Sequence, residues 1–394
     1  MFRISLYVFV FGFAVLNMSC KPSGEDKKVA DTIDIDSLLN IRYSKLLKYP
    51  VDSMAFPRSY NVATNTIKKV PSKDWTSGFF VGNLWQIYAL TGDDAYKKRA
   101  EQWTPLVERE KLNNRTHDMG FKVFCSFGNG LKANKNDYYK NVIIKSAQTL
   151  STRFNENVGS IRSWDFNKDI WEFPVIIDNM MNLELLFEAT KITKDSSFHK
   201  MAVTHANTTL RNHFRDDNST YHVVVYDTIN GSVKQKVTHQ GINDESAWAR
   251  GQAWAIYGYT MAYRYTKNAD YLKQAEETAN FFIDHPNLPA DGIPYWDFDD
   301  PKVPNAPRDV SAGTVVASAL IELYAYTQNE KYLNHSKKVI DQLQSENYIL
   351  EAGIEAPFIL KHSTGNWPKN DEIDEPIVYA DYYFLEALLR LKAL

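Results

Sequence analysis

A recurring helix–turn–helix frame constrains the fold of this 394-residue chain more than any other feature of its sequence. In this frame a helix ends at a Thr, a few Asp, Asn or Gly residues turn the chain, and a Tyr restarts a helix five residues after the Thr. The frame occurs in YALTGDDAYKKRA (88–100), YRYTKNADYLKQA (263–275) and YAYTQNEKYLNHS (324–336), and with a longer turn in FEATKITKDSSFHKMA (187–202). Four helical hairpins of one design predict a ring of α-hairpins, while their irregular spacing argues against a solenoid of identical units.

The hydrophobic pattern beyond residue 38 is mostly helical. We expect helices over 79–91, 94–108, 137–153, 179–190, 196–213, 248–266, 269–284, 311–327, 330–345 and 376–393. A small β-hairpin insertion is predicted from YHVVVYDT (221–228) and SVKQKV (232–237), joined through Asn230-Gly231. The helix count fits an all-α fold of the (α/α)6-barrel type, with an inner and an outer ring of helices. No linker rich in Pro, Gly or Ser interrupts the chain after residue 40, so 39–394 is expected to be one catalytic domain.

The first 20 residues resemble an export signal. Arg3 precedes an apolar run from about Ile4 to Leu16, which is too short for a spanning helix, and small and polar residues lead to Cys20. Cys20 stands where a bacterial lipoprotein carries its acylated cysteine, although Leu16 lies one residue further upstream than is usual. Residues 21–38 then form a polar tether. We therefore expect an exported protein in the periplasm or at the cell surface, with membrane contact only through a lipid anchor at Cys20.

Several classes of function find no support in the sequence. The net charge of −3 gives no electrostatic reason to expect a nucleic-acid partner. There is no HExxH, no CxxC and no cluster of the nine His at ligand spacing, so neither a metal nor another cofactor is expected. The chain also lacks a GxSxG elbow, and GNG (128–130) is not a dinucleotide fingerprint. Cys125, the only cysteine besides Cys20, is expected to be a small core residue.

One acid stands in an otherwise apolar stretch, FPVIIDNMMNLELLFEAT (173–190). Asp178 precedes the periodic part of a predicted helix, so its side chain could cap the N–H groups of the first turn, which lack partners. It could instead be a catalytic carboxyl. This stretch alone favours the cap.

Polar residues beside aromatic residues or glycine recur at seven predicted loop-to-helix junctions. The segments are DWTSGFF (74–80), RTHDMGF (115–121), IIDNMMN (176–182), VTHQGINDESAWARGQAWAIYGY (237–259), PYWDFDDP (294–301), RDVSAG (308–313) and ILKHSTGNWPK (359–369). Each has a structural explanation of its own, such as a turn cap for Asp118, an ion pair with a surface acid for Arg250, and core packing for Trp254. In a helical ring, however, such junctions line one mouth. Together, in a chain with 13% aromatic residues, they favour a carbohydrate site.

Five motifs from these segments and a sixth in the C-terminal tail carry a family resemblance. DWTSGFF, THDMGF, DNMMNLELL, WARGQAW, RDVSAG and the tail VYADYYFLEALLRL occur in this order from about Trp75 to the C-terminus. In them the chain resembles the unsaturated glucuronyl hydrolases, glycoside hydrolase family 88, and the interval from Asp118 to Asp178 matches the family's two essential aspartates. The resemblance implies an (α/α)6 barrel and an oligosaccharide substrate that ends in a 4,5-unsaturated uronic acid, the product of a polysaccharide lyase.

Carried over residue by residue, the resemblance makes Asp178 the proton donor and Asp118 its catalytic partner. It also implies which residues surround the unsaturated ring: Trp75, His222, Gln240, Arg250 and Trp254, with Thr238 and Lys361 to Ser363 as looser matches.

The chemistry of such a substrate agrees with these roles. Protonation at C4 of the C4=C5 enol ether leaves an oxocarbenium at C5 that water can trap, which requires a carboxyl group protonated near neutral pH. Because a helix N-terminus favours the anion, we expect Asp118, with aromatic and methionine neighbours, to raise the pKa of Asp178. Arg250 is expected to hold the substrate carboxylate as a fork. Trp75 or Trp254 would supply a stacking face.

Two alternatives remain open. The sister family 105 removes unsaturated galacturonate from rhamnogalacturonan by the same chemistry on the same fold, although RGQAW (250–254) favours the glucuronyl side. A non-catalytic, lipid-anchored glycan-binding protein on a decayed barrel is the other, but both aspartates and the RGQAW motif are intact. The sequence does not distinguish ulvan, chondroitin, hyaluronan and heparin fragments as the substrate.

Overall fold

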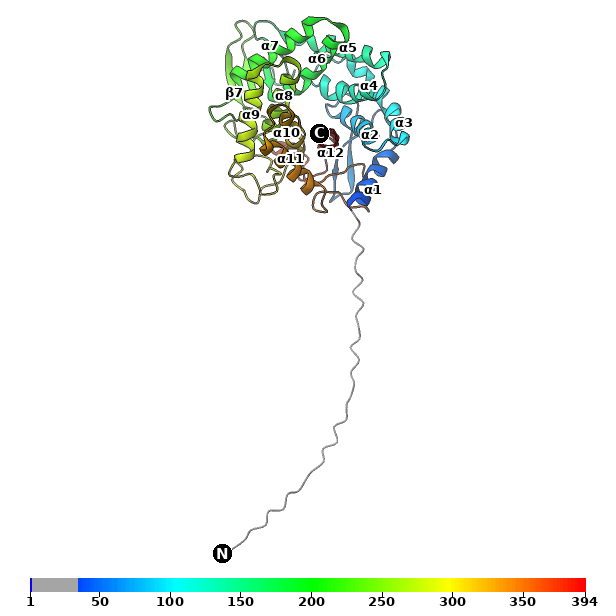
Figure 1. Ribbon diagram of the computed structural model, residues 1–394. Helices are drawn as coiled ribbons and strands as arrows, with labels where there is room; N and C mark the ends of the chain where they lie inside the picture. Colours follow the sequence, from blue (N-terminus) through cyan, green and yellow to red (C-terminus); the bar gives the residue numbers. More distant parts are fainter. Residues whose placement is uncertain (2–34) are drawn as a thin grey trace. The chain divides into compact units, whose positions relative to one another are not determined.

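The computed structural model describes Met1 and residues 35–394 (Figure 1). The predictions of an export signal and of an acylated Cys20 concern residues outside the described part of the chain, as does most of the tether. The last residues assigned to the tether, 35–38, are instead the first turn of helix α1 (Ile35–Lys48). Residues 35–394 form one compact unit.

The described residues form a barrel with an inner ring of six helical segments. They are α2 (Ser77–Thr91), η2 (Gly120–Gly128) with α4 (Asn129–Ala133), η3 (Ile177–Asn182) with α6 (Leu183–Thr193), α8 (Ala249–Thr266), α10 (Val310–Thr327) and α12 (Val378–Lys392). Each packs against the next, and α12 packs against α2, which closes the ring (Figure 1). The (α/α)6 prediction is confirmed.

The outer helices follow the inner ones in sequence and cover them. They are α3 (Asp94–Trp103), α5 (Asp137–Ser151), α7 (Ser196–Asn212), α9 (Ala269–Asp284) and α11 (Glu330–Leu343), and α1 packs against α2 and α3. The predicted helix over 94–108 is wrong at its end, since α3 gives way to the 3-10 segment η1 (Thr104–Leu112), which has Pro105 in its first turn. The inner helix α10 is long and apolar enough to cross a membrane, but it is mostly buried inside the protein, as an inner helix of a barrel must be.

The repeated frame is a device for reversing the chain between rings. After the terminal Thr comes a residue in the left-handed conformation, then an Asp or Asn whose side chain caps the next helix: Gly92 and Asp93, Lys194 and Asp195, Lys267 and Asn268, Gln328 and Asn329. The aromatic residue five positions after the Thr is buried in each hairpin: Tyr96, Phe198, Tyr271 and Tyr332. The longer turn expected in 187–202 is therefore wrong, because Thr193 rather than Thr190 ends that helix and the spacing is the same.

Small antiparallel sheets stand among the loops. The predicted hairpin is confirmed as β6 (Val223–Tyr226) and β7 (Val233–Val237). A strand that the sequence did not indicate, β5 (Pro174–Ile176), pairs with the other edge of β6. The remaining pairs are β1 (Phe56–Asn61) with β2 (Thr66–Val70) and β3 (Phe154–Asn155) with β4 (Ser160–Ile161).

The ring closes through a tight contact at Gly82 of α2, and this contact can be tested. A Cβ at Gly82 would lie 2.4 Å from the Tyr382 ring and 2.7 Å from the Cys125 carbonyl oxygen. Gly82→Ala should therefore lower the free energy of unfolding by about 1–3 kcal/mol through overpacking. Gly353→Ala, where the added Cβ meets no atom within 4 Å, is the control and should change it by less than about 0.5 kcal/mol. Urea denaturation measures both, and equal effects would contradict the closing contact.

Candidate active site

The predicted site residues gather at the mouth where the inner helices begin. Trp75 stands two residues before α2, Asp118 two residues before η2, Asp178 within η3, and Arg250 second in α8. These four residues line one cavity of about 310 Å³. The cavity is also lined by Arg58, His117, Phe121, Trp164, Phe166, Ile176, His239, Gln240, Gly365, Asn366, Lys369, Asp371 and Tyr379.

Asp178 is positioned by the sheet that precedes it. The backbone of β5 pairs with β6, and Ile177 N–H donates to the His222 carbonyl oxygen at 3.0 Å, so η3 starts with Asp178 beside His222. Asp178 does not cap η3: the cap position is Ile176, and no side chain bonds there. Its Oδ2 atom is buried and has no hydrogen-bond partner among the described residues. Of the two readings of this acid, the structure therefore rejects the cap.

Burial sets the acidity of Asp178. Desolvation raises the pKa of Asp178 to about 7, against the opposing charge of Arg250, while Asp118 adds a smaller upward effect. The expectation that Asp118 tunes this group is therefore correct in direction, but burial is the larger cause. The carboxyl group is half protonated near neutral pH, as a general acid requires.

His222 presents a fixed N–H toward this carboxyl group. Its Nδ1 accepts the backbone N–H groups of His239 and Gln240, each at 3.1 Å. Burial holds the pKa of His222 well below its ordinary value, so the ring is neutral and its one proton lies on Nε2, 3.7 Å from Asp178 Oδ2. A ring held as a donor on this side cannot take the proton of Asp178.

Asp118 lies in a polar turn. Its Oδ2 accepts the Thr116 hydroxyl at 2.5 Å, and its Oδ1 lies 3.2 Å from His117 Nε2. The backbone N–H of Asp118 donates in turn to Thr116 Oγ1. These contacts fix the carboxylate at the cavity wall, where it can accept a proton from water.

Arg250 is less free than the sequence suggests. It is buried, with Nη1 donating to the Asp309 carboxylate and, at 2.7 Å, to the Thr364 carbonyl oxygen, while Nη2 donates to the Gly365 carbonyl oxygen. Its Nη1 donors are thus already used within the protein. The end-on fork expected to grip a substrate carboxylate is not open in this conformation.

The other predicted residues divide into those that face the cavity and those that do not. Gln240 lines it and donates to the Gly365 carbonyl oxygen at 3.0 Å. Trp254 is completely buried between Phe121 and Tyr383, so of the two proposed stacking residues only Trp75 is available.

Thr238 and Lys361 to Ser363 do not line the cavity. The Thr238 hydroxyl accepts the Gly241 N–H within its own turn. Lys361 reaches Glu351, and His362 pairs with Asp374. The residues that follow, Gly365 to Asp371, supply the wall that Lys361 to Ser363 were expected to supply.

An aromatic group that was not predicted from the sequence also lies at this mouth. Trp164 stacks on Phe166 with ring centroids 4.9 Å apart, and His239 lies 5.0 Å from Trp164. Phe166 is 44% exposed, so the group offers an open apolar face. Its only sequence signal is SWDF (163–166), which lies outside any helical pattern.

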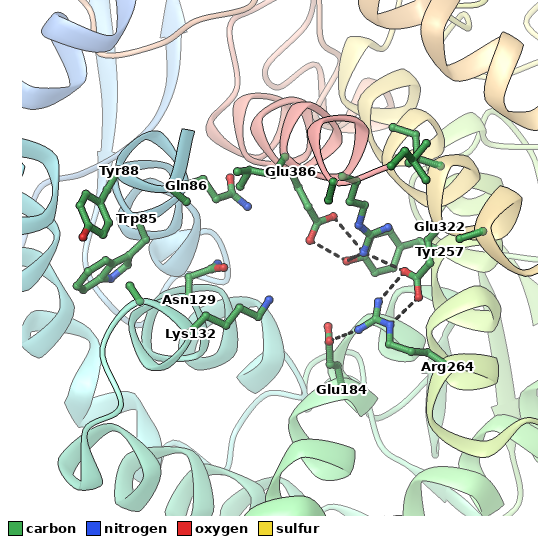
Figure 2. A pocket seen from close by; sticks show the side chains of 18 residues that line it. Trp85, Gln86, Tyr88, Asn129, Lys132, Glu184, Tyr257, Arg264, Glu322 and Glu386 are labelled. Carbon is green, nitrogen blue, oxygen red and sulfur yellow. Dashed lines mark hydrogen bonds and ion pairs between the residues drawn. The ribbon is translucent and has the colours of Figure 1, made fainter. Parts of the chain in front are cut away.

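A larger cavity, of about 610 Å³, lies at the opposite mouth, where the inner helices end (Figure 2). Two arginines in its lining pair with its glutamates: Arg264 with Glu184 and Glu322, and Arg390 with Glu322 and Glu386. None of the predicted site residues lines it. Among residues 35–394, no group of three or more His, Cys, Asp or Glu could hold a metal ion.

The chain is similar to known proteins of one family. Residues 53–293 match the profile of Glycosyl Hydrolase Family 88. The chain belongs to this family. It is accordingly a glycoside hydrolase that acts on unsaturated uronosyl sugars, which removes the non-catalytic alternative.

Related proteins match most of the length of this chain. The chain is 61% identical to an unsaturated glucuronyl hydrolase of Formosa agariphila, over 98% of each protein, and 33% identical to one of Bacillus sp. (strain GL1), over 81% of this chain and 86% of that one. A crystal structure of an unsaturated glucuronyl hydrolase specific for heparin superposes with a TM-score of 0.88 at 44% identity, covering 91% of this chain and 97% of that one.

The raised pKa of Asp178 makes stability depend on pH. The folded chain holds the Asp178 proton more tightly than the unfolded chain, so this contribution is complete below about pH 4 and is lost as the pH rises through about 7. Asp178→Asn, which cannot ionise, should therefore be more stable than the wild type at pH 8, with the difference shrinking toward pH 4. Thermal denaturation across this range measures it. A difference independent of pH would mean that Asp178 does not titrate there.

Proposed function

We propose that this enzyme removes the 4,5-unsaturated glucuronic acid from the non-reducing end of lyase-generated oligosaccharides by protonation and hydration of the C4=C5 enol ether. The observation that carries the proposal is Asp178, a partly buried carboxyl group whose pKa of about 7 leaves it able to donate a proton, in the wall of a cavity of sugar size. Aromatic residues and the cationic groups of Arg58, Arg250 and Lys369 line the same cavity, which suits an anionic ring.

The chemical steps assign one role to each carboxyl group. Asp178 transfers its proton to C4, which forms a C–H bond and leaves an oxocarbenium at C5. Water adds at C5 and gives up a proton to Asp118, whose contacts with Thr116 and His117 hold it at the wall. The resulting hemiketal opens and releases the neighbouring sugar. Because the neutral His222 presents Nε2–H to Asp178, it does not compete for the proton.

The proposed substrates are fragments of ulvan or of glycosaminoglycans. Relatives with about 30% identity are unsaturated chondroitin disaccharide hydrolases of streptococci, and one solved relative is described as specific for heparin. The unsaturated ring is the same in all these substrates, so the neighbouring sugar must determine which substrate the enzyme prefers. A panel of lyase products, including rhamnogalacturonan fragments as the family 105 test, followed by loss of the enol-ether ultraviolet absorbance, ranks them.

We also propose that the enzyme is exported to the periplasm or cell surface and lipid-anchored through Cys20. The support is the sequence of residues 1–20 alone. Labelling of the expressed protein with a fatty acid, lost in Cys20→Ser, tests this proposal.

Removal of either carboxyl group should abolish most turnover. Asp178→Asn should lower kcat by about 10²–10⁴-fold because an amide cannot donate the proton, and Asp118→Asn should also be severe. Asp195→Asn is a control, because Asn serves equally well at this helix cap. Steady-state kinetics on a lyase-generated disaccharide measures all three. An Asp178→Asn variant with ordinary activity would remove Asp178 from its role.

The pH profile separates the two causes of the raised pKa. In the wild type, kcat/KM should fall as the pH rises past about 7, where Asp178 loses its proton. Asp118→Asn removes a like charge and should move this fall to lower pH in its residual activity, but only slightly, because burial is the larger cause. A large shift would make Asp118 the main determinant.

A solvent isotope experiment separates hydration from ordinary glycoside hydrolysis without any mutant. A conventional hydrolase protonates the glycosidic oxygen, so no C–H bond forms. In heavy water, the proposed mechanism should place deuterium at C4 of the released keto-uronate, at first on one face only. Proton NMR at early times detects it before exchange beside the ketone blurs the label. Release of the neighbouring sugar without deuterium at C4 would contradict the proposed mechanism.

A further inference from the structure

The segment from His362 to Asp374, called the C-terminal loop below, carries unusual backbone strain. Four of its residues have positive φ without being glycine: His362 (66°), Asn370 (50°), Glu372 (57°) and Asp374 (57°). Asn and Asp adopt the left-handed region more readily than other non-glycine residues, but it is unfavourable for Glu372, so the surrounding structure must hold Glu372 there. None of the four has a role in the proposed chemistry.

The loop is folded back on itself. Ser363 and Glu375 exchange backbone hydrogen bonds of 3.0 and 2.9 Å, and Asn366 and Asp371 do the same. Between these pairs, the Gly365 N–H donates to the Glu372 carbonyl oxygen at 2.7 Å. The two arms of the loop thus form a single unit, and a displacement of Glu372 would also displace Gly365.

Glu372 is the anchor of this unit. Its side chain is 1% exposed and is bound side-on by Arg58, with Nε at 2.7 Å and Nη2 at 2.9 Å from the two carboxylate oxygens. Lys68 Nζ lies 3.3 Å away. A buried, bidentate ion pair fixes orientation as well as distance.

The loop in turn holds two residues of the active site. The Thr364 and Gly365 carbonyl oxygens accept from the Arg250 guanidinium, and the Gly365 carbonyl oxygen also accepts from Gln240. A Cβ on Gly365 would lie 2.5 Å from Glu372 Oε2, so the Glu372 side chain packs against Gly365 and leaves no room for a side chain there.

Arg58 also reaches the other wall of the site. Its Nη1 donates to Asp74 Oδ2 at 3.0 Å, and Asp74 Oδ1 accepts the N–H and hydroxyl of Thr76. Trp75 lies between these two residues, and the Arg58 guanidinium stands 6.0 Å from its ring. One side chain therefore joins the turn that carries Trp75 to the loop that carries the acceptors of Arg250.

We propose that Arg58 and Glu372 are positioning residues of the reaction, which hold the C-terminal loop so that its carbonyl groups place Arg250 and Gln240 against the bound uronate. The inference rests on the proposed function, since it assumes the same substrate in the same cavity. The charged and titratable groups that act on Asp178 are Arg250 from α8, Asp118 before η2 and the neutral His222 before β6. Of these, Arg250 is the one that the loop holds.

The main test is Glu372→Gln, with Glu322→Gln as the matched control. Glu322 has the same side-on contact with Arg264, but at the opposite mouth (Figure 2). Glu372→Gln should raise KM about tenfold or more, with a smaller change in kcat. It should also move the fall of kcat/KM to higher pH, because an Arg250 that drifts from Asp178 lowers its pKa less. Glu322→Gln should leave both at wild-type values, whatever it does to the melting temperature.

A second variant guards against loss of folding. If Glu372→Gln does not fold, Glu372→Asp keeps the charge but shortens the reach to Arg58, and it should show the same two shifts. Wild-type KM and an unmoved pH profile in a folded Glu372 variant would overturn the positioning proposal.

A third measurement does not depend on turnover. If the wild type releases no product from any lyase fragment, the proposed function fails. The pH at which the Asp178→Asn stability difference stops growing is set by the pKa of Asp178 in the folded chain. Measured with and without Glu372→Gln, this pH still shows whether the loop acts on Asp178 through Arg250. An unchanged pH would overturn the positioning proposal in that case too.

Discussion

The packing of α12 against α2 is the constraint on which the rest of the structure depends. It joins the last inner helix to the first and closes the ring, with Gly82 against the Tyr382 ring and the Asn83 side chain on the Val378 carbonyl oxygen. The same contact sets Trp75 against Tyr379, with ring centroids 4.9 Å apart, at the mouth of the active site. An open ring would leave one wall of the cavity without its partner.

The two mouths of the barrel differ in how their charges are satisfied. At the mouth opposite the active site, Arg264 and Arg390 form ion pairs with neighbouring glutamates (Figure 2). At the active-site mouth, one oxygen of Asp178 has no hydrogen-bond partner among the described residues, and desolvation raises the pKa of this group. A buried polar group without a partner costs stability. Such a group is retained where the reaction needs a carboxyl proton that is not already donated in a hydrogen bond within the protein.

The cationic group of Arg250 is bound by acceptors of the protein itself. Arg250 donates to the Asp309 carboxylate and to the Thr364 and Gly365 carbonyl oxygens, which fix its orientation. Such preorganisation lowers the cost of orienting groups when substrate binds. The strain in the C-terminal loop is consistent with this, because strained backbone persists where neighbouring contacts over-determine it.

The sequence by itself determined the ring of hairpins and indicated the two aspartates as candidate site residues. The turn frame, the caps and the apolar faces are local patterns that repeat every three or four residues or within one turn, so they can be recognised without the fold. The motifs likewise identified Asp118 and Asp178. Local patterns failed at 120–133, where three glycines interrupt an inner helical segment, and at β5, whose three residues depend on pairing with β6.

Only the tertiary structure decided how the site is arranged. It buried Trp254, turned Thr238 away from the cavity, occupied Arg250 and made desolvation the main cause of the high pKa of Asp178. Arg58 and Glu372 are 314 positions apart, and no local pattern links them. The physical reason is that desolvation and ion pairing depend on which groups surround a residue in space, and those neighbours come from segments brought together only when the ring closes.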